Sequence, residues 1–136
     1  MVTPRPLGPL CDMAEALDPA LTPLLDAGAP PAKLFPAVLR SLQERPGGVT
    51  LIFEDVHWAD HATLDLIRYL GRRIIALRAL LILGLREDEL SPHRPSRQPI
   101  GDLSGGATLR INLEPLSEMG VAALAEASGR PPGDLH

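Results

Sequence analysis

Apolar residues near the start of the chain recur at the spacing of an α-helix. Leu7, Leu10, Ala14 and Leu17 fall on one helical face, which predicts a helix over about residues 7–17. Four prolines between residues 19 and 31 then interrupt the pattern. A second amphipathic pattern predicts a helix over residues 31–43, which ends at the Pro-Gly-Gly breaker of residues 46–48.

Two short apolar runs have the composition of buried β-strands. Residues 49–53 read Val-Thr-Leu-Ile-Phe, and residues 79–85 read Ala-Leu-Leu-Ile-Leu-Gly-Leu. Continuous apolar runs of this kind are typical of parallel strands that are buried on both faces. Between them, Asp60 is suited to cap a helix whose apolar stripe continues to Leu77. Strand, helix and strand in this order predict a right-handed βαβ unit.

The last third of the chain has a weaker pattern. Residues 91–107 are rich in Pro, Ser, Gly and Arg, which predicts an irregular loop. Leu109, Ile111 and Leu113 alternate with polar residues, so residues 108–113 are predicted as a third strand. Ser117 is suited to cap a final helix. With no internal repeat and no second pattern, residues 1–136 are expected to form one α/β domain with a mainly parallel sheet flanked by helices.

The composition excludes several classes of function. A net charge of −4 and an aromatic content of 3% argue against direct nucleic-acid binding by this chain. The single cysteine, Cys11, cannot form an internal disulfide and is expected to be a small buried apolar group. No apolar run reaches the roughly 20 residues that span a bilayer. The first residues also lack the layout of a signal peptide, so we expect a cytoplasmic protein without membrane contact.

The strand ends carry the residues with the clearest chemical use. Glu54 and Asp55 directly follow the first strand, and Arg86 follows the second. In open parallel sheets, ligands bind beyond the carboxyl ends of the strands. One carboxylate can hold a hydrated Mg²⁺ on a nucleotide phosphate, the other can orient or deprotonate water, and the guanidinium can contact a terminal phosphate. The alternatives are a solvated acidic strand end, and a salt bridge from Arg86 to the acidic residues at 87–89.

These segments resemble a known family. LIFEDVHWAD, HATLDLIRYLGRRI and LLILGLREDEL together resemble the ATPase core of the large ATP-binding LuxR-type transcriptional regulators, which are AAA-like (STAND) signal-transduction ATPases. RPLGPLCDMAEAL is similar to the segment that follows the phosphate-binding helix in that family, and EPLSEMGVAALA is similar to its strand-to-helix passage. The resemblance covers nearly the whole chain and is weakest over residues 91–107.

The resemblance implies part of a P-loop NTPase-like core that uses ATP and Mg²⁺. Glu54 and Asp55 correspond to the Walker B acidic pair, which serves the metal and the nucleotide, and Arg86 corresponds to the sensor-1 position. The usual order in the motif is a metal-ligating Asp followed by a catalytic Glu. Because the order is reversed in this sequence, the two carboxylates are treated as one shared site.

The sequence departs from the family in one decisive respect. The phosphate-binding loop G-x-x-x-x-G-K-[ST] is absent, since the only lysine, Lys33, has no glycine loop around it. The family's C-terminal passage and its helix-turn-helix reader are absent as well. We therefore expect a partial ATPase domain that is inactive alone and belongs with other domains of a larger regulator or with an ATPase partner. The alternatives are a catalytically inactive interaction module and a non-functional truncated remnant.

Several other residues are assigned structural roles. A zinc site at His57 and His61 is disfavoured because Trp58 stands where the metalloprotease pattern needs glutamate, and no third ligand is evident. His57 is expected to make a structural hydrogen bond, and Trp58 is expected to pack against the acidic pair. Four arginines are expected on solvated surfaces: Arg72, Arg73, Arg94 and Arg97.

Overall fold

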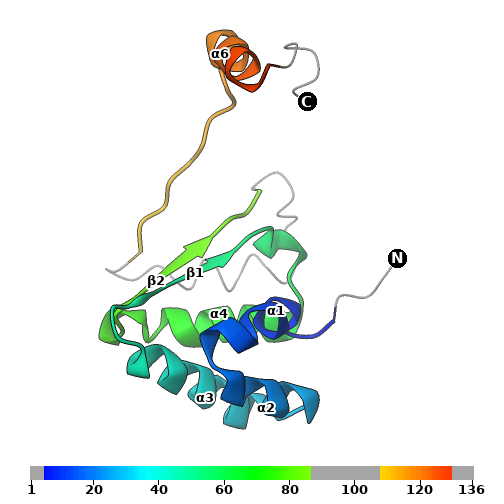
Figure 1. The fold of residues 1–136 in the computed structure, drawn as a ribbon, viewed down its shortest axis with the longest axis vertical. Coiled ribbons are helices and arrows are strands. Elements are labelled where there is room, and N and C mark those ends of the chain that lie inside the picture. The colour runs from blue at the N-terminus through cyan, green and yellow to red at the C-terminus, as the bar shows by residue number, and fades with distance from the viewer. Residues whose placement is uncertain (1–4, 87–107, 130–136) are drawn as a thin grey trace.

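The described part of the chain contains a helical N-terminal half, a strand–helix–strand unit and a C-terminal helix. The computed structural model describes residues 5–86 and 108–129. In chain order the elements are α1 (Gly8–Leu17), η1 (Pro19–Leu21), α2 (Thr22–Asp26), α3 (Pro31–Glu44), β1 (Val49–Phe53), η2 (Val56–Trp58), α4 (His61–Gly71), η3 (Ile74–Ala76), β2 (Ala79–Leu83) and α6 (Glu118–Ser128), where η denotes a short 3₁₀ helix. Helices α1 to α4 lie on one side of the strands, and α6 follows an extended segment (Figure 1).

The N-terminal helices form where the apolar spacing predicts them. Helices α1 and α3 begin and end within one residue of their predicted bounds. Pro19 and Pro23 do not simply interrupt the chain, because they occupy the first turns of η1 and α2. A proline fits there since the N–H groups of a first turn have no partner within the helix. In the described residues, no helix is both long and apolar enough to cross a bilayer.

A polar cluster fixes the end of α1 against α3. The hydroxyl of Ser41, which is buried in α3, donates to Asp18 Oδ2 at 2.6 Å. The backbone N–H of Ala20 donates to Asp18 Oδ1 at 2.9 Å. The Ser41 hydroxyl first, and then the Ala20 N–H, hold the pKa of Asp18 below its usual value of 3.8. The Arg45 guanidinium donates to backbone carbonyls at the end of α1.

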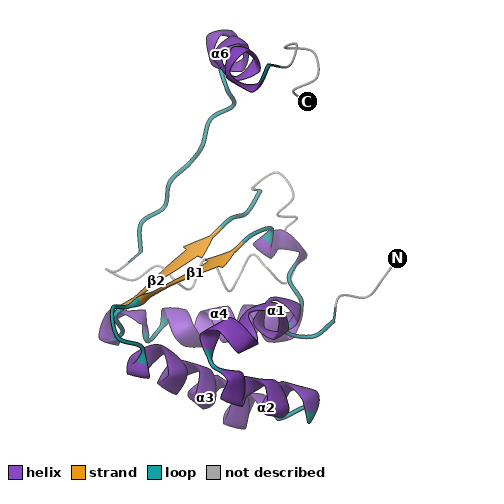
Figure 2. Ribbon diagram, in the orientation of Figure 1, coloured by secondary structure: helices purple, strands orange, loops and turns teal. Residues whose placement is uncertain are grey.

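The predicted order of strand, helix and parallel strand is confirmed. Strands β1 and β2 pair in parallel, with Val49 opposite Ala79 at one end and Phe53 opposite Leu83 at the other. Helix α4 connects the strands and is fully buried along Leu66 and Ile67. It ends at Gly71 and not at Leu77, because the chain turns back toward β2 through η3. Figure 2 shows the two-stranded parallel sheet lying over the helices.

The prediction that both strands are buried on both faces is wrong. Leu51 and Phe53 of β1 are buried against the helices. The opposite face of the sheet is exposed, and we call it the open sheet face; its residues are Thr50, Ile52, Leu80 and Ile82. The physical reason is that all four helices α1 to α4 cover the same side.

The predicted third strand is also wrong. Residues 108–113 form no strand, and within the described residues the sheet consists of β1 and β2 alone. The segment runs as an extended chain toward α6 (Figure 1), and its apolar side chains are exposed. An alternating sequence becomes a strand only when a neighbouring strand takes up its backbone hydrogen bonds. The final helix, in contrast, begins after Ser117 as predicted, with the Ser117 hydroxyl accepting from the Gly120 N–H at 3.1 Å.

Candidate functional site

The acidic pair lies at the carboxyl end of the sheet, between two backbone hydrogen bonds. The N–H of Gly84 donates to the carbonyl of Phe53 at 2.8 Å, and the N–H of Val56 donates to the carbonyl of Gly84 at 2.9 Å. Glu54 and Asp55 therefore form a short loop whose two ends are both fastened to the end of β2. This attachment fixes the position of the loop on the sheet edge.

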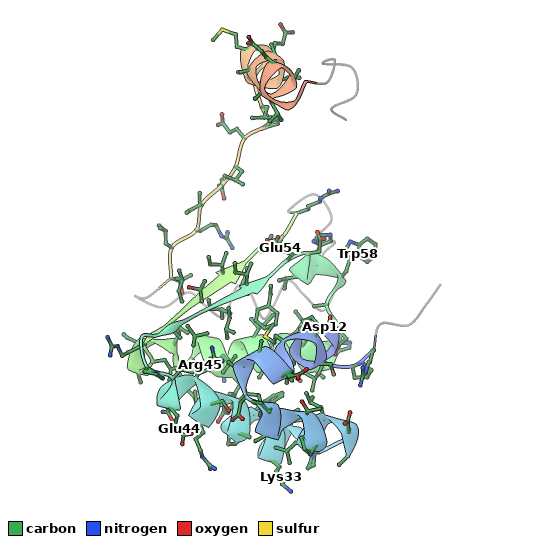
Figure 3. All side chains as sticks on the ribbon, in the orientation of Figure 1. Asp12, Lys33, Glu44, Arg45, Glu54 and Trp58 are labelled. Atoms are coloured by element: carbon green, nitrogen blue, oxygen red, sulfur yellow. The ribbon has the colours of Figure 1, made fainter. Side chains whose placement is uncertain are left out.

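The side chain of Glu54 lies against Gly84. A Cβ atom at position 84 would stand 2.5 Å from Glu54 Oε2 and 3.4 Å from its Cδ. The carboxylate thus occupies the space that any other residue at position 84 would fill. Figure 3 shows Glu54 at this end of β1. The glycine that directly follows β2, within the apolar run of residues 79–85, is the sequence signal for this close approach.

Asp55 has an unusual backbone and an accessible carboxylate. Its φ of 51° and ψ of 40° lie in the left-handed region, which aspartate tolerates better than most residues do. The side chain of Asp55 is 69% exposed, and its Oδ1 lies 3.8 Å from Nε2 of His57, whose side chain is almost fully buried. The buried imidazole thus lies next to one oxygen of a carboxylate that faces solvent.

Arg86 lies beyond the end of β2, two residues after Gly84. Because β1 and β2 are parallel, the chain that carries Arg86 leaves the sheet at the same edge as Glu54 and Asp55. The Arg86 side chain is exposed. Its predicted salt-bridge partners at residues 87–89 lie outside the described residues.

A cavity of about 290 Å³ opens beside the acidic loop. Its walls come from Arg5, from α1 residues that include Asp12, and from the segment after β1 that includes Glu54 and Asp55. The Trp58 side chain lines this cavity together with Glu54 and Asp55 and is 59% exposed, so it is not a buried packing anchor. Its ring lies 5.6 Å from that of His57, at an angle of 53°. Figure 3 shows Trp58 beyond the end of β1.

Asp60 is confirmed as a helix cap. Its Oδ1 accepts from the backbone N–H groups of Ala62 and Thr63 at 2.9 and 3.1 Å, and its Oδ2 accepts from the Thr63 hydroxyl at 2.5 Å. Oδ2 also accepts from the N–H of Leu7 at 3.2 Å. This last bond joins the N-terminal turn to the start of α4 across 53 residues of sequence. Spacing alone gave no signal for it, because Leu7 takes part through its backbone.

The two histidines that were weighed as a metal site are placed differently. His57 is buried, whereas His61 is exposed at the first position of α4. Over residues 5–86 and 108–129, there is no group of three or more His, Cys, Asp or Glu side chains that could hold a metal ion. Glu54 and Asp55 would therefore need oxygen ligands from a bound phosphate or from water to complete a metal site.

The remaining residues singled out from the sequence lie away from the acidic loop. Cys11 is half-buried in α1, which is less than predicted. Arg72 and Arg73 are exposed as predicted, and the Arg73 guanidinium stacks 3.8 Å from the centre of the Tyr69 ring. Arg94 and Arg97 lie outside the described residues, as does the loop predicted over 91–107.

Comparison with known proteins gives no independent assignment. The chain matches no protein-family model, no curated protein and no solved structure.

Proposed function

We propose that this chain supplies the acidic part of a Mg²⁺–nucleotide site in an ATPase domain of a signalling or transcriptional regulator. The observation that carries the proposal is the parallel register of β1 and β2. It brings Glu54 and Asp55 to the same sheet edge from which the chain continues to Arg86. Ligands of open α/β sheets bind beyond this edge.

The donor set at this edge fits Mg²⁺. The ion prefers carboxylate oxygens, usually one or two of them, and fills its other positions with water and phosphate oxygens. Glu54 and Asp55 offer two carboxylates on adjacent residues, and that of Asp55 is largely exposed. When bound with a nucleotide, Mg²⁺ would neutralise negative charge on the phosphates.

We assign the protein's own groups complementary roles. Asp55 would hold the hydrated cation, since its carboxylate reaches solvent. Glu54, held close to Gly84, would orient or deprotonate an attacking water, and the two acids are able to exchange these tasks. Arg86 would contact the terminal phosphate as a sensor of hydrolysis. A complete P-loop NTPase-like core further needs the glycine-rich lysine loop, which this sequence does not contain.

Paramagnetic mapping tests the proposal directly. Mn²⁺ added with ATP to the ¹⁵N-labelled chain should broaden backbone amide signals of residues 54–56 and 84–86 first. Asp55→Asn and Glu54→Gln should weaken this local effect, whereas Glu44→Gln, a substitution in α3 far from the sheet edge (Figure 3), should leave it unchanged. If the same signals broadened equally in the Asp55→Asn variant, the assignment would be refuted. We expect no ATP turnover by the chain alone.

A second candidate is a catalytically inactive interaction module. It is favoured by the open sheet face, where apolar side chains contact solvent. A circular dichroism melt separates this candidate from a non-functional remnant. A cooperative transition supports a folded module, and a melt without cooperativity supports the remnant.

A further inference from the structure

The cavity beside the acidic loop has an apolar and aromatic wall. The indole of Trp58 lines it together with Pro9, Phe53 and Val56. The buried His57 ring contacts the indole, with the ring centres 5.6 Å apart, and the Trp58 side chain is still 59% exposed. Apolar and aromatic walls with a few polar groups are the usual lining of a small-molecule site. An indole in such a wall can stack with a planar ring.

The polar groups of the cavity specify what a ligand must offer. The carboxylates of Glu54 and Asp55 are already assigned to the proposed cation, and both oxygens of Asp60 accept from protein groups. Asp12 and Arg5 also line the cavity, and both are exposed. A carboxylate only accepts hydrogen bonds and a guanidinium only donates them. A ligand that satisfies both therefore carries an N–H donor and an acceptor, as an amino-bearing heteroaromatic ring does.

The size and charge of the cavity favour a ring over a phosphate group. Its volume of about 290 Å³ is close to the lower limit of ligand pockets, which is about 300 Å³. One ring system of a ligand is thus a better match than a whole nucleotide. The carboxylates of Asp12, Glu54 and Asp55 would repel phosphate oxygens unless a metal ion lay between them.

The backbone around the cavity is strained at two places. Among the described residues, Leu7 and Asp55 are the non-glycine residues with positive φ, at 56° and 51°. Asp55 lines the cavity, and Leu7 lies between Arg5 and Gly8, which also line it. Strained residues of this kind cluster at functional sites and ligand clamps. Their position supports a binding role for this cavity.

We propose that the cavity binds an amino-bearing heteroaromatic ring, which stacks on the indole of Trp58 while its amino group donates to the Asp12 carboxylate. Figure 3 shows Asp12 on α1 and Trp58 beyond the end of β1. The Arg5 guanidinium would donate to a ring nitrogen. Two sources share this chemistry: the base of the nucleotide proposed at the sheet edge, and a separate small ligand. The ring contacts come from Trp58 and Asp12, so the inference does not depend on the metal site.

Fluorescence titration with adenosine tests the ring site without phosphate or metal. Because Trp58 is the only tryptophan of the chain, its emission reports on the cavity. Adenosine should change this emission until it saturates, and should shift the amide signals of Arg5, Asp12 and Trp58. Purine riboside, the same ring without the amino group, should bind about tenfold more weakly. Asp12→Ala should remove this difference, whereas Glu15→Ala, on the same helix but outside the cavity, should retain it.

Calorimetry with the Trp58→Ala variant distinguishes the two sources. If the ring is the base of the nucleotide, this variant should bind ATP with Mg²⁺ about tenfold more weakly and should bind tripolyphosphate with Mg²⁺ as the wild-type chain does. If the ring belongs to a separate ligand, the variant should lose adenosine binding and keep the binding of ATP with Mg²⁺.

Three results would overturn the proposal. They are a Trp58 emission that adenosine does not change, equal binding of adenosine and purine riboside by the wild-type chain, and adenosine binding that survives Trp58→Ala. A wild-type chain that binds adenosine but neither magnesium salt would refute the metal site and leave the ring site standing.

Discussion

Replacing Gly84 by alanine should displace the Glu54 carboxylate while leaving the fold intact. The added Cβ would stand 2.5 Å from Glu54 Oε2. The carboxylate must move by about 0.5 Å to reach the shortest separation that real Cβ atoms show, 3.0 Å, and by about 0.9 Å to reach ordinary contact at 3.4 Å. The closest atom is the tip of a flexible side chain, so the carboxylate yields more readily than the backbone.

The two energetic effects of this substitution nearly cancel in the free energy of unfolding. An off-rotamer Glu54 side chain costs about 0.5–1.5 kcal/mol. Replacing glycine by alanine in an unstrained conformation stabilises by about 0.4–1 kcal/mol, because the unfolded chain loses freedom. We therefore expect a net change within about 1 kcal/mol, measured by urea unfolding. Mn²⁺–ATP broadening around Glu54 should nevertheless fall, since the carboxylate is displaced from the sheet edge.

Gly120→Ala in α6 is the matched control. A Cβ at position 120 meets nothing closer than 3.4 Å, and the site is outside the acidic loop. This variant should gain about 0.5–1 kcal/mol in the free energy of unfolding. Its amide signals at residues 54–56 and 84–86 should broaden with Mn²⁺ and ATP as they do in the wild-type chain. A loss of more than about 2 kcal/mol in Gly84→Ala would mean that backbone, and not a side-chain tip, fills the space. An unchanged Mn²⁺–ATP effect would show that Glu54 takes no part in the site.

Three further predictions concern single polar groups. Asp60→Ala should lower the free energy of unfolding by about 1–2 kcal/mol in urea, because it removes the α4 cap and the bond to the Leu7 N–H. The lowered pKa of Asp18 stabilises the fold above the usual value of 3.8, and this contribution is lost as the pH falls through the lower folded value. When urea midpoints are measured on both sides of pH 3.8, the drop toward acid pH should be smaller in the Ser41→Ala variant than in the wild-type chain. Asp55→Gly should change stability by less than about 1 kcal/mol, whereas Asp55→Ala should cost about 1–2 kcal/mol, since only glycine adopts positive φ freely. Both substitutions should abolish the signal broadening by Mn²⁺ and ATP. Equal stability of the two variants would contradict the left-handed backbone of residue 55.

Local patterns predicted the elements well where the local signal and the packing agree. The helical faces of α1 and α3, the βαβ order and the Asp60 and Ser117 caps all follow from residues within one turn or one run. The third strand failed because its alternation specifies a half-buried surface but not the neighbour that buries it. The two-faced burial of β1 and β2 failed for the same reason, since the run of apolar residues says nothing of which layers are present.

The geometry of the acidic loop depends on contacts that spacing does not reveal. Glu54 and Asp55 were identified from their position after β1, yet their arrangement depends on Gly84 and on the backbone of Val56, which fasten the loop to β2. Trp58 was expected to support the acidic pair as a packing anchor, but the 3₁₀ turn η2 buries His57 and leaves the neighbouring indole 59% exposed. Adjacent residues in a tight turn point in different directions. A short motif therefore identifies the residues of the turn but does not predict which of their side chains is buried.

The left-handed backbone of Asp55 connects these observations. A non-glycine residue at positive φ costs free energy, and such residues persist where the surrounding contacts over-determine them. At Asp55 those contacts are the two hydrogen bonds that bracket the loop and the turn η2 that follows it. Together they hold the backbone close to β2 while the Asp55 carboxylate stays 69% exposed. Glycine would adopt this backbone at a lower cost, so replacing Asp55 by glycine separates the conformation of the turn from the exposed carboxylate to which we propose to assign the cation.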